Sequence, residues 1–386
     1  ATARIDVGTT AGKILQLDGS ARIPAISGAN LTNAPGPTQS TSDPTISTNL
    51  TLGAKWINKT TGAVYICTDA TAGENVWTNV GAGSGNIQLA FQGSAYGYTT
   101  GGQQAGASGY DTIDKFSYTS QSDATDVGNL AVTMWYHSGA SSGTHGFAFC
   151  GGGYANSINK YSHTSDGNAT DHGDTTTSQG SGAGCSDLGA GYGYHCGGTA
   201  GGQPGQRIHK DKFAFSSNTT ATDIGDMSQR RHALAGISSS THGYNAGGAH
   251  WAEGSDYNTI DRWAFASGGD SVDVGDLTYG RMTQSGASSA THGYVAGAYS
   301  ISPAGYTNII DKFLYAANSN STDVGDLTAT IQGNAASSAT DAGYSVGGQP
   351  AATLNRIEKW SFTTDGSATD WADLSQSRVY PATSQV

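Results

Sequence analysis

The chain has 386 residues, 36% of them hydrophobic, so it can fill a core and is long enough for several domains. Its 57 glycines and 8 prolines lack the period of collagen, and only 12% of its residues are charged. Much of the rest is Ser, Thr, Asn and Ala, with 19 Tyr and 7 Trp. This composition favours short strands and tight turns over long helices and predicts an all-β protein.

The net charge of −12 is unevenly distributed. Residues 1–88 hold five basic and five acidic residues, so the whole negative excess falls on residues 89–386. An acidic body without Lys or Arg stripes repels phosphate backbones, which argues against nucleic-acid binding. No window approaches the run of about 18 apolar residues that a transmembrane helix needs, so we expect no membrane insertion.

The first residues, ATARIDVGTT, lack the basic stretch and apolar run of a secretory signal. An initial Ala is what remains after an initiator Met is removed, so we expect a nearly complete chain that folds in a cytoplasm. Residues 1–40 are polar and Gly-rich, with single apolar positions that are too sparse to bury a core alone. They predict an extended arm that attaches and oligomerises.

Residues 41–88 predict a small β connector module. Between Leu52 and Val80 the sequence LGAKWINKTTGAVYICTDATAGENVWTNV alternates like short strands, with TTG as a hairpin turn. Trp56, Tyr65 and Trp77 can form a small core.

Both N-terminal segments resemble the attachment and connector modules of bacteriophage tail-fibre and related virion fibre proteins. The resemblance rests on ILQLDGSARIPAISGANLTN and WINKTTGAVYICTDATAGENVW and covers most of residues 8–80. It implies attachment to other virion proteins, assembly in a host cytoplasm and a homotrimer formed through residues 1–88. It does not distinguish the tail from the capsid. The alternative is a flexible leader before a propeller.

Residues 89–386 contain six copies of one phrase: TIDKFSY, SINKYSH, HKDKFAF, TIDRWAF, IIDKFLY and RIEKWSF. Their acidic or amide residues lie 45 to 52 residues apart, and are Asp114, Asn159, Asp211, Asp261, Asp311 and Glu358. An aromatic residue followed by a Gly pair, as in Tyr98 with Gly101 and Gly102, precedes each copy, and a phrase such as TDVGDL follows. Each unit therefore reads as four short strands.

Four strands in about 50 residues make one propeller blade, and the 298 residues from 89 to 386 supply six blades. The last segment, SQSRVYPATSQV, matches the opening of other units, so we expect it to complete or flank the first blade by pairing near Asn86 to Phe91. The GYxxGG strand and the later aromatic strand resemble kelch and galactose-oxidase-like propellers. The predicted fold is a six-bladed kelch-like β-propeller of four-stranded blades, preceded by the arm and the small module.

The repeated residues have an expected structural role. The Gly pair suits a strand end where neighbouring blades crowd together. The aromatic residues of each phrase lie on one strand face and are expected to pack between blades. The six acidic or amide residues are expected to form ion pairs or turn hydrogen bonds rather than a catalytic ladder.

The sequence carries no complete catalytic motif. His145, His242 and His292 occupy one repeated turn position, so a copper site of the galactose oxidase type is not expected. The sequences SDGNATDHG and TTDGSATDW lack the spacer of a sialidase Asp box. No GxSxG elbow, phosphate loop or HExxH helix is present. Paired carboxylates across the propeller stay open.

The four cysteines show no CxxC pair and no His at zinc spacing. We therefore expect Cys67, Cys150, Cys185 and Cys196 to be free, buried thiols. Cys150 and Cys196 are expected at equivalent repeat positions. No metal or other cofactor is predicted.

The loops between the second and third strands of the units differ sharply, whereas the opposite loops are monotonous. These variable loops and the links between blades should emerge on one face, and a constant scaffold with variable loops is typical of a binding surface. Its candidate contacts are mainly aromatic. They are Tyr110, Trp135, Tyr136, Tyr154, His250, Trp251, Asp256, Tyr257, Tyr279, Tyr299 and Tyr306.

These patterns favour a non-enzymatic virion fibre or spike protein whose propeller binds a host cell-surface glycan or protein. Two other classes stay open: a virion-associated glycan-processing enzyme and a cellular kelch-like adhesion module.

Overall fold

The computed structural model describes residues 36–80, 91–104, 108–153, 155–200, 205–250, 253–350 and 352–386. The chain divides into two compact units, Ala1–Ile87 and Gln88–Val386. All strands and turns of these described ranges belong to an all-β fold, as predicted. A helix long and apolar enough to cross a membrane is not found in them. Of the predicted arm, residues 1–35 lie outside the described residues.

The first unit contains one small sheet with the strand order β1-β2-β3-β4. Its strands are β1 (Thr38–Ser40), β2 (Lys55–Asn58), β3 (Val64–Asp69) and β4 (Val76–Asn79). The predicted hairpin turn lies between β2 and β3, with Gly62 at a φ of 76°. Tyr65 and Trp77 are fully buried, and Trp56 packs edge-on against Trp77 with 6.0 Å between ring centroids. The expected small core is therefore confirmed.

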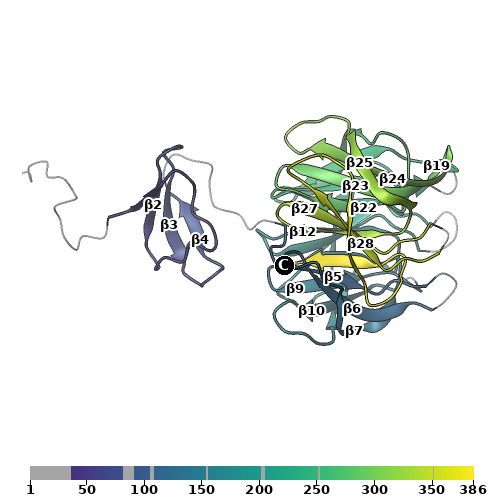
Figure 1. The fold of residues 1–386 in the computed structure, drawn as a ribbon, viewed down its shortest axis with the longest axis horizontal. Coiled ribbons are helices and arrows are strands. Elements are labelled where there is room, and N and C mark those ends of the chain that lie inside the picture. Colours follow the sequence, from purple (N-terminus) through teal and green to yellow (C-terminus); the bar gives the residue numbers. More distant parts are fainter. Residues whose placement is uncertain are drawn as a thin grey trace, which may run out of the picture. The chain divides into compact units, whose positions relative to one another are not determined.

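The second unit is a six-bladed β-propeller, as predicted (Figure 1). The strands of each blade are given from the inside outward. Blade 1 consists of β30 (Ala382–Gln385), β5 (Tyr96–Thr100), β6 (Tyr110–Ser117) and β7 (Thr125–Met134). Blade 2 consists of β8 (Ser138–Ser141), β9 (His145–Phe149), β10 (Ser157–Ser162) and β11 (Thr170–Asp174), and blade 3 of β12 (Ala183–Asp187), β13 (Tyr192–Cys196), β14 (His209–Ala214) and β15 (Thr222–Asp226).

Blade 4 consists of β16 (Ala235–Ser238), β17 (His242–Ala246), β20 (Thr259–Ala264) and β21 (Gly268–Asp276). Blade 5 consists of β22 (Ser285–Ser288), β23 (His292–Ile301), β24 (Ala304–Leu314) and β25 (Thr322–Ile331). Blade 6 consists of β26 (Ala335–Ser338), β27 (Ala342–Val346), β28 (Arg356–Ser361) and β29 (Thr369–Asp373). A short extra hairpin, β18 (Ala249–His250) and β19 (Ser255–Asp256), lies in a loop of blade 4. The six innermost strands contact one another around the central axis.

The C-terminal strand closes the ring, and its end lies beside β5 in Figure 1. Within blade 1, β30 pairs antiparallel with β5, from Ala382 opposite Thr100 to Gln385 opposite Gly97. The predicted completion of blade 1 is confirmed, but the predicted partner, Asn86 to Phe91, is wrong. Of that stretch only Phe91 is described, and it accepts a side-chain hydrogen bond from Gln385. The pairing with β5 occurs because the GYxxGG strand is the second strand of every blade.

Aromatic rings stack at every junction between blades, as predicted. A ring at the end of the third strand of one blade lies over the aromatic ring of the GYxxGG strand of the preceding blade, with centroids 4.6 to 5.1 Å apart. The pairs are His163 on Tyr98, Phe215 on Phe147, Phe265 on Tyr194, Tyr315 on Tyr244, Phe362 on Tyr294 and Tyr118 on Tyr344. These stacks give all six junctions the same apolar packing.

The six acidic or amide residues bind the preceding blade, which confirms their scaffold role. Each accepts a hydrogen bond from a backbone N–H in the last part of that blade's outer strand or just after it, at 2.8 to 3.0 Å. Four of them also form ion pairs with arginines. In three pairs both partners are fully buried: Asp114 with Arg378, Asp261 with Arg231 and Asp311 with Arg281. Glu358 pairs with the partly exposed Arg356.

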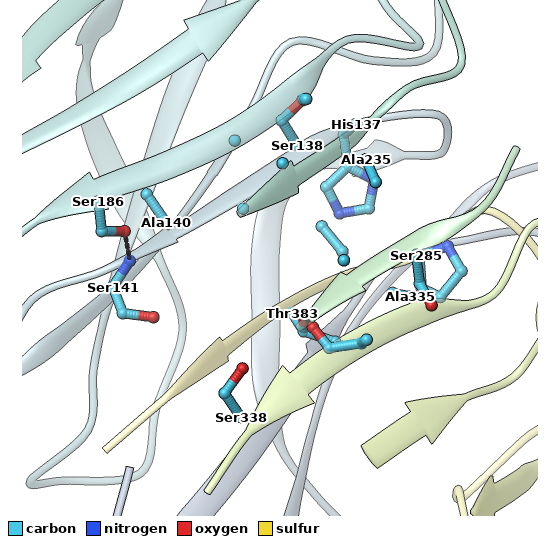
Figure 2. A pocket seen from close by; sticks show the side chains of 18 of the residues that line it. His137, Ser138, Ala140, Ser141, Ser186, Ala235, Ser285, Ala335, Ser338 and Thr383 are labelled. Atoms are coloured by element: carbon cyan, nitrogen blue, oxygen red, sulfur yellow. Dashed lines mark hydrogen bonds between the residues drawn. The ribbon is translucent and has the colours of Figure 1, made fainter. Parts of the chain in front are cut away.

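A narrow channel runs along the axis between the inner strands. It has a volume of about 140 Å³ and small side chains around it, including Ser138, Ala140, Ala235 and Ser285 (Figure 2). Serine hydroxyls link neighbouring strands, and the dashed line in Figure 2 marks the bond from the Ser141 N–H to Ser186 Oγ at 2.9 Å. The small side chains leave room for water-sized guests.

Candidate functional site

The variable loops and the links between blades lie on the same face of the propeller, as predicted. Single β-bridges join a link residue to a loop residue of the next blade, such as His232 to Ala249, Met282 to Tyr299 and Gln332 to Gln349. We call this face the variable face. The inner strands begin here and end at the opposite face.

Six equivalent link residues form a closed ring at the centre of the variable face. The N–H of each donates to the carbonyl oxygen of the equivalent residue in the preceding link, at 2.6 to 3.1 Å. All six have a φ between 54° and 65°, a conformation that is costly for residues other than Gly. They are Tyr136, Ser181, Ala233, Thr283, Gly333 and Tyr380. The closed set of hydrogen bonds therefore holds strained backbone at one level around the axis.

A cavity of about 450 Å³ lies over this ring, and we call it the central hollow. Its lining includes five ring residues together with Trp135, Gly151, Gly152, Gly153, Gly180, Thr199, His232, Met282 and Gln332. The volume falls in the range of small-ligand sites.

One wall of the central hollow is aromatic. The Tyr136 and Tyr380 rings stack with centroids 3.8 Å apart. The Tyr380 ring packs against Gly333 so closely that a Cβ on Gly333 would lie 2.5 Å from it. The Trp135 indole fits between two glycines, because a Cβ on Gly109 or Gly152 would approach it to 2.2 or 2.4 Å. The glycines thus leave room for the large rings.

Across the ring from Tyr136 and Tyr380 lie Thr283 and Ala233, and the other described lining residues include the small Gly180 and Ser181. The lining also contains polar groups: Thr283 Oγ1 donates to the Met282 carbonyl at 2.6 Å and lies 3.2 Å from Gln332 Oε1. A ligand in the central hollow therefore meets a flat aromatic surface on one side and small and polar groups on the other.

The central hollow carries no charged side chain among its described lining residues. Burial lowers the pKa of His232 to about 4, although the hydrogen bond from its Nδ1 to the Ala249 carbonyl acts in the opposite direction. Burial raises the pKa of Tyr380. At neutral pH these two side chains are therefore uncharged.

Two predicted contact residues, Trp135 and Tyr136, lie in the central hollow. Tyr299 and Tyr306 form a cross-strand pair beside it, with ring centroids 5.7 Å apart. Their segment was predicted as a loop, but it continues β23 and β24 as a long hairpin. Asp256 accepts a hydrogen bond from the Ile301 N–H of this hairpin.

Four predicted contacts lie against other side chains of the propeller. Tyr110 and Tyr279 lie 5.9 and 5.2 Å from the guanidinium carbons of the buried Arg378 and Arg281. The Tyr257 hydroxyl donates to Glu253 at 2.6 Å, and His250 lies 4.0 Å from the same carboxylate. Tyr154 and Trp251 lie outside the described residues. The contact role of these residues stays a prediction.

Sequence reasoning missed Tyr380, His232, Met282 and Gln332 as lining residues of the central hollow. A signal was present, because each lies one or two residues after the repeated position that Arg231, Arg281 and Arg378 occupy. This position precedes the first strand of every blade, so the residues after it must reach the axis.

The four cysteines are free and buried, as predicted. Their expected equivalence is wrong: Phe149 and Cys196 occupy equivalent positions, opposite the first residues of β8 and β12, and Cys150 lies one residue later. Cys150 replaces the first glycine of the Gly pair and has its positive φ of 61°. No group of three His, Cys, Asp or Glu residues that could hold a metal ion occurs in the described part of the chain.

Comparison with known proteins supports the fold alone. No protein-family model matches the chain, and no curated protein matches it. Among the solved structures that resemble it is that of YjhT, with a TM-score of 0.54 and 11% sequence identity. The match covers 66% of this chain and 88% of the YjhT chain. At this identity the likeness shows a shared β-propeller fold and carries no information on activity.

Proposed function

We propose that this protein is a non-enzymatic virion fibre or spike protein of a bacteriophage, whose variable face binds a glycan on the host surface. The observation that carries the binding role is the central hollow, which has an aromatic wall and an uncharged described lining at the centre of the variable face. Aromatic rings on a rigid scaffold give large contact areas at low entropic cost.

The entry point of the chain is compatible with this role. Gln92 donates its side-chain N–H to the Ser288 carbonyl at 3.0 Å, and the Gly93 N–H donates to the Ser338 carbonyl at 2.8 Å. Ser288 and Ser338 are the last residues of two inner strands, so the chain enters near the axis on the face opposite the variable face.

Residues 1–88 are proposed to attach to other virion proteins and to form a homotrimer. The described core of the small module consists of only four buried residues, Ala63, Tyr65, Cys67 and Trp77. Leu52, Val76 and Val80 are 69%, 43% and 55% exposed. Apolar side chains exposed on such a small unit support burial against further chains.

The test is binding of the purified full-length chain to a panel of bacterial cells and their extracted surface polysaccharides, with its mass in solution measured in parallel. We expect binding to at least one polysaccharide, about tenfold weaker binding by Trp135→Ala, and a trimeric mass. Release of shortened or oxidised sugars would instead favour the glycan-processing enzyme. A monomer that binds no bacterial surface would contradict the proposal.

A further inference from the structure

The aromatic wall of the central hollow continues beyond its rim onto the hairpin of blade 5. Met282, which lines the hollow, exchanges two backbone hydrogen bonds with Tyr299, at 2.8 and 2.9 Å. Tyr299 lies against Tyr306, which is 40% exposed, and the Tyr306 hydroxyl is close enough to help raise the pKa of Tyr380 after the larger effect of burial. Trp135, Tyr136, Tyr380, Tyr306 and Tyr299 thus line one path, which we call the aromatic track.

The charges around the aromatic track argue against an anionic ligand. The arginines of the neighbouring links, Arg231, Arg281 and Arg378, are fully buried and each is paired with an Asp. They therefore offer no cation to a carboxylate or phosphate in the central hollow. The net charge of −12 on the chain also disfavours anions.

The arrangement of the rings also argues against a cationic ligand. A quaternary ammonium group is best held by aromatic faces on several sides. In the central hollow the ring residues opposite Tyr136 and Tyr380 are Thr283 and Ala233, and neither is aromatic. One aromatic wall facing small and polar groups suits a flat ring that has an apolar face and hydroxyl groups at its edge, which describes a pyranose.

We propose that the aromatic track binds a neutral oligosaccharide, with its terminal sugar in the central hollow against Trp135 and its following sugars along Tyr306 and Tyr299. This inference rests on the proposed function, because it names the ligand class and its direction across the same site. The continuity of the hollow with the hairpin through Met282 and Tyr299 is the observation that favours a chain of sugars over a single sugar.

The experiment is calorimetric titration of the full-length chain with neutral gluco-, manno- and galacto-oligosaccharides of one to four units, and with matched oligosaccharides that carry sialic or uronic acid. We expect the neutral ligands to bind, with about tenfold higher affinity for three units than for one. Trp135→Ala should weaken every length about tenfold, while Trp135→Phe, which keeps a ring, should stay within about threefold of the native chain.

Tyr306→Ala is the informative variant. It should leave the affinity for a monosaccharide unchanged and lower that for a trisaccharide about tenfold. The matched control is Tyr96→Ala, because Tyr96 is also 40% exposed but begins β5 at the end of blade 1 that faces away from the hollow. Tyr96→Ala should change neither the affinity for the monosaccharide nor that for the trisaccharide. Thermal unfolding of all variants checks that they are folded.

Binding restricted to acid-bearing ligands, binding of tetramethylammonium in place of sugars, or equal effects of Tyr306→Ala on all lengths would each overturn the aromatic track. The proposed function would survive those results if Trp135→Ala still weakened attachment to bacterial surfaces. If Trp135→Ala changed neither sugar binding nor attachment, both would fail.

Discussion

Two junctions of the propeller have the same geometry but different chemistry. Between blades 4 and 5, Arg281 and Asp311 form a fully buried ion pair at 2.8 Å. Between blades 1 and 2 the equivalent residues are Met134 and Asn159, and the Asn159 amide lies 3.5 Å from the Met134 sulfur. In both junctions the acceptor on the third strand still binds a backbone N–H of the preceding blade, at 3.0 and 2.9 Å.

The comparison teaches that a junction needs the hydrogen bond and the shape more than the charge. A buried ion pair often adds little over a well-packed neutral pair, whereas a single charge left without its partner is strongly unfavourable. Asp211 illustrates this second case: its arginine position is occupied by Gln179, and burial raises its pKa despite hydrogen bonds from Thr176.

The largest loss of stability is expected from a feature that the two junctions share, a glycine of the inner strand that contacts the backbone of the preceding blade. A Cβ on Gly139 would approach the Thr383 carbonyl oxygen to 2.3 Å, and a Cβ on Gly286 would approach that of Gly236 equally closely. Because backbone atoms block the space, Gly139→Ala and Gly286→Ala should each destabilise the protein by about 4 kcal/mol or more in urea unfolding. Gly143→Ala, at a turn with nothing within 4 Å of the new Cβ, is the control. Unequal losses at the two junctions would break the comparison.

The second effect tests whether one junction can be converted into the other. Arg281→Met leaves Asp311 buried without its cation and should cost about 3 to 5 kcal/mol of unfolding free energy. Adding Asp311→Asn creates the Met and Asn pair of the blade 1–2 junction and should recover more than half of this loss. If the double variant is no more stable than Arg281→Met, shape alone does not make a junction.

The smallest effect concerns the histidine of the blade 1–2 junction. Burial, helped by His145 and Lys115, lowers the pKa of His163 to about 3. Between about pH 6.5 and this value only the unfolded chain binds the proton, so the unfolding free energy falls as the pH falls through this window. His163→Phe introduces the phenyl ring that other blades have at this position. It should make the loss of unfolding free energy between pH 6.5 and pH 5 about 2 kcal/mol smaller than in the native chain.

Urea unfolding at the two pH values measures this difference. His292→Ala is the control, because His292 is only half-buried and occupies the position of Ala342 in blade 6. An unchanged pH dependence in His163→Phe would mean that His163 does not stay neutral in the folded chain.

The periodic part of this architecture could be predicted from the sequence. Blade number, strand order, the stacked rings and the role of residues such as Asp311 follow from side chains that recur at one spacing. The strand that pairs with β30 was predicted at Asn86 to Phe91, whereas the observed partner is β5, a few residues later in the chain. The GYxxGG strand, which is the second strand in every other unit, indicates the correct pairing. In blade 2, Cys150 stands where other units have the first glycine of the Gly pair, and this difference concealed the register of the blade.

The central hollow could be predicted only in part. Trp135 and Tyr136 were recognised as aromatic link residues, whereas Tyr380 and Gln332 were not. The ring beneath them is made by backbone atoms, and the side chains at its six positions range from Gly333 to Tyr136. A feature that places no demand on side-chain type leaves no pattern in the residues.

That ring of six hydrogen bonds has an electrostatic consequence. Its N–H and C=O groups follow one another around the axis in a single rotational sense, so their dipole components in the plane of the ring circulate and nearly cancel. The start of a helix does the opposite, since its aligned N–H groups attract anions. In the ring each of the six N–H groups is already paired with a carbonyl oxygen, so the floor beneath a guest offers none of them to an anion, and selection among guests falls to shape and surface contact.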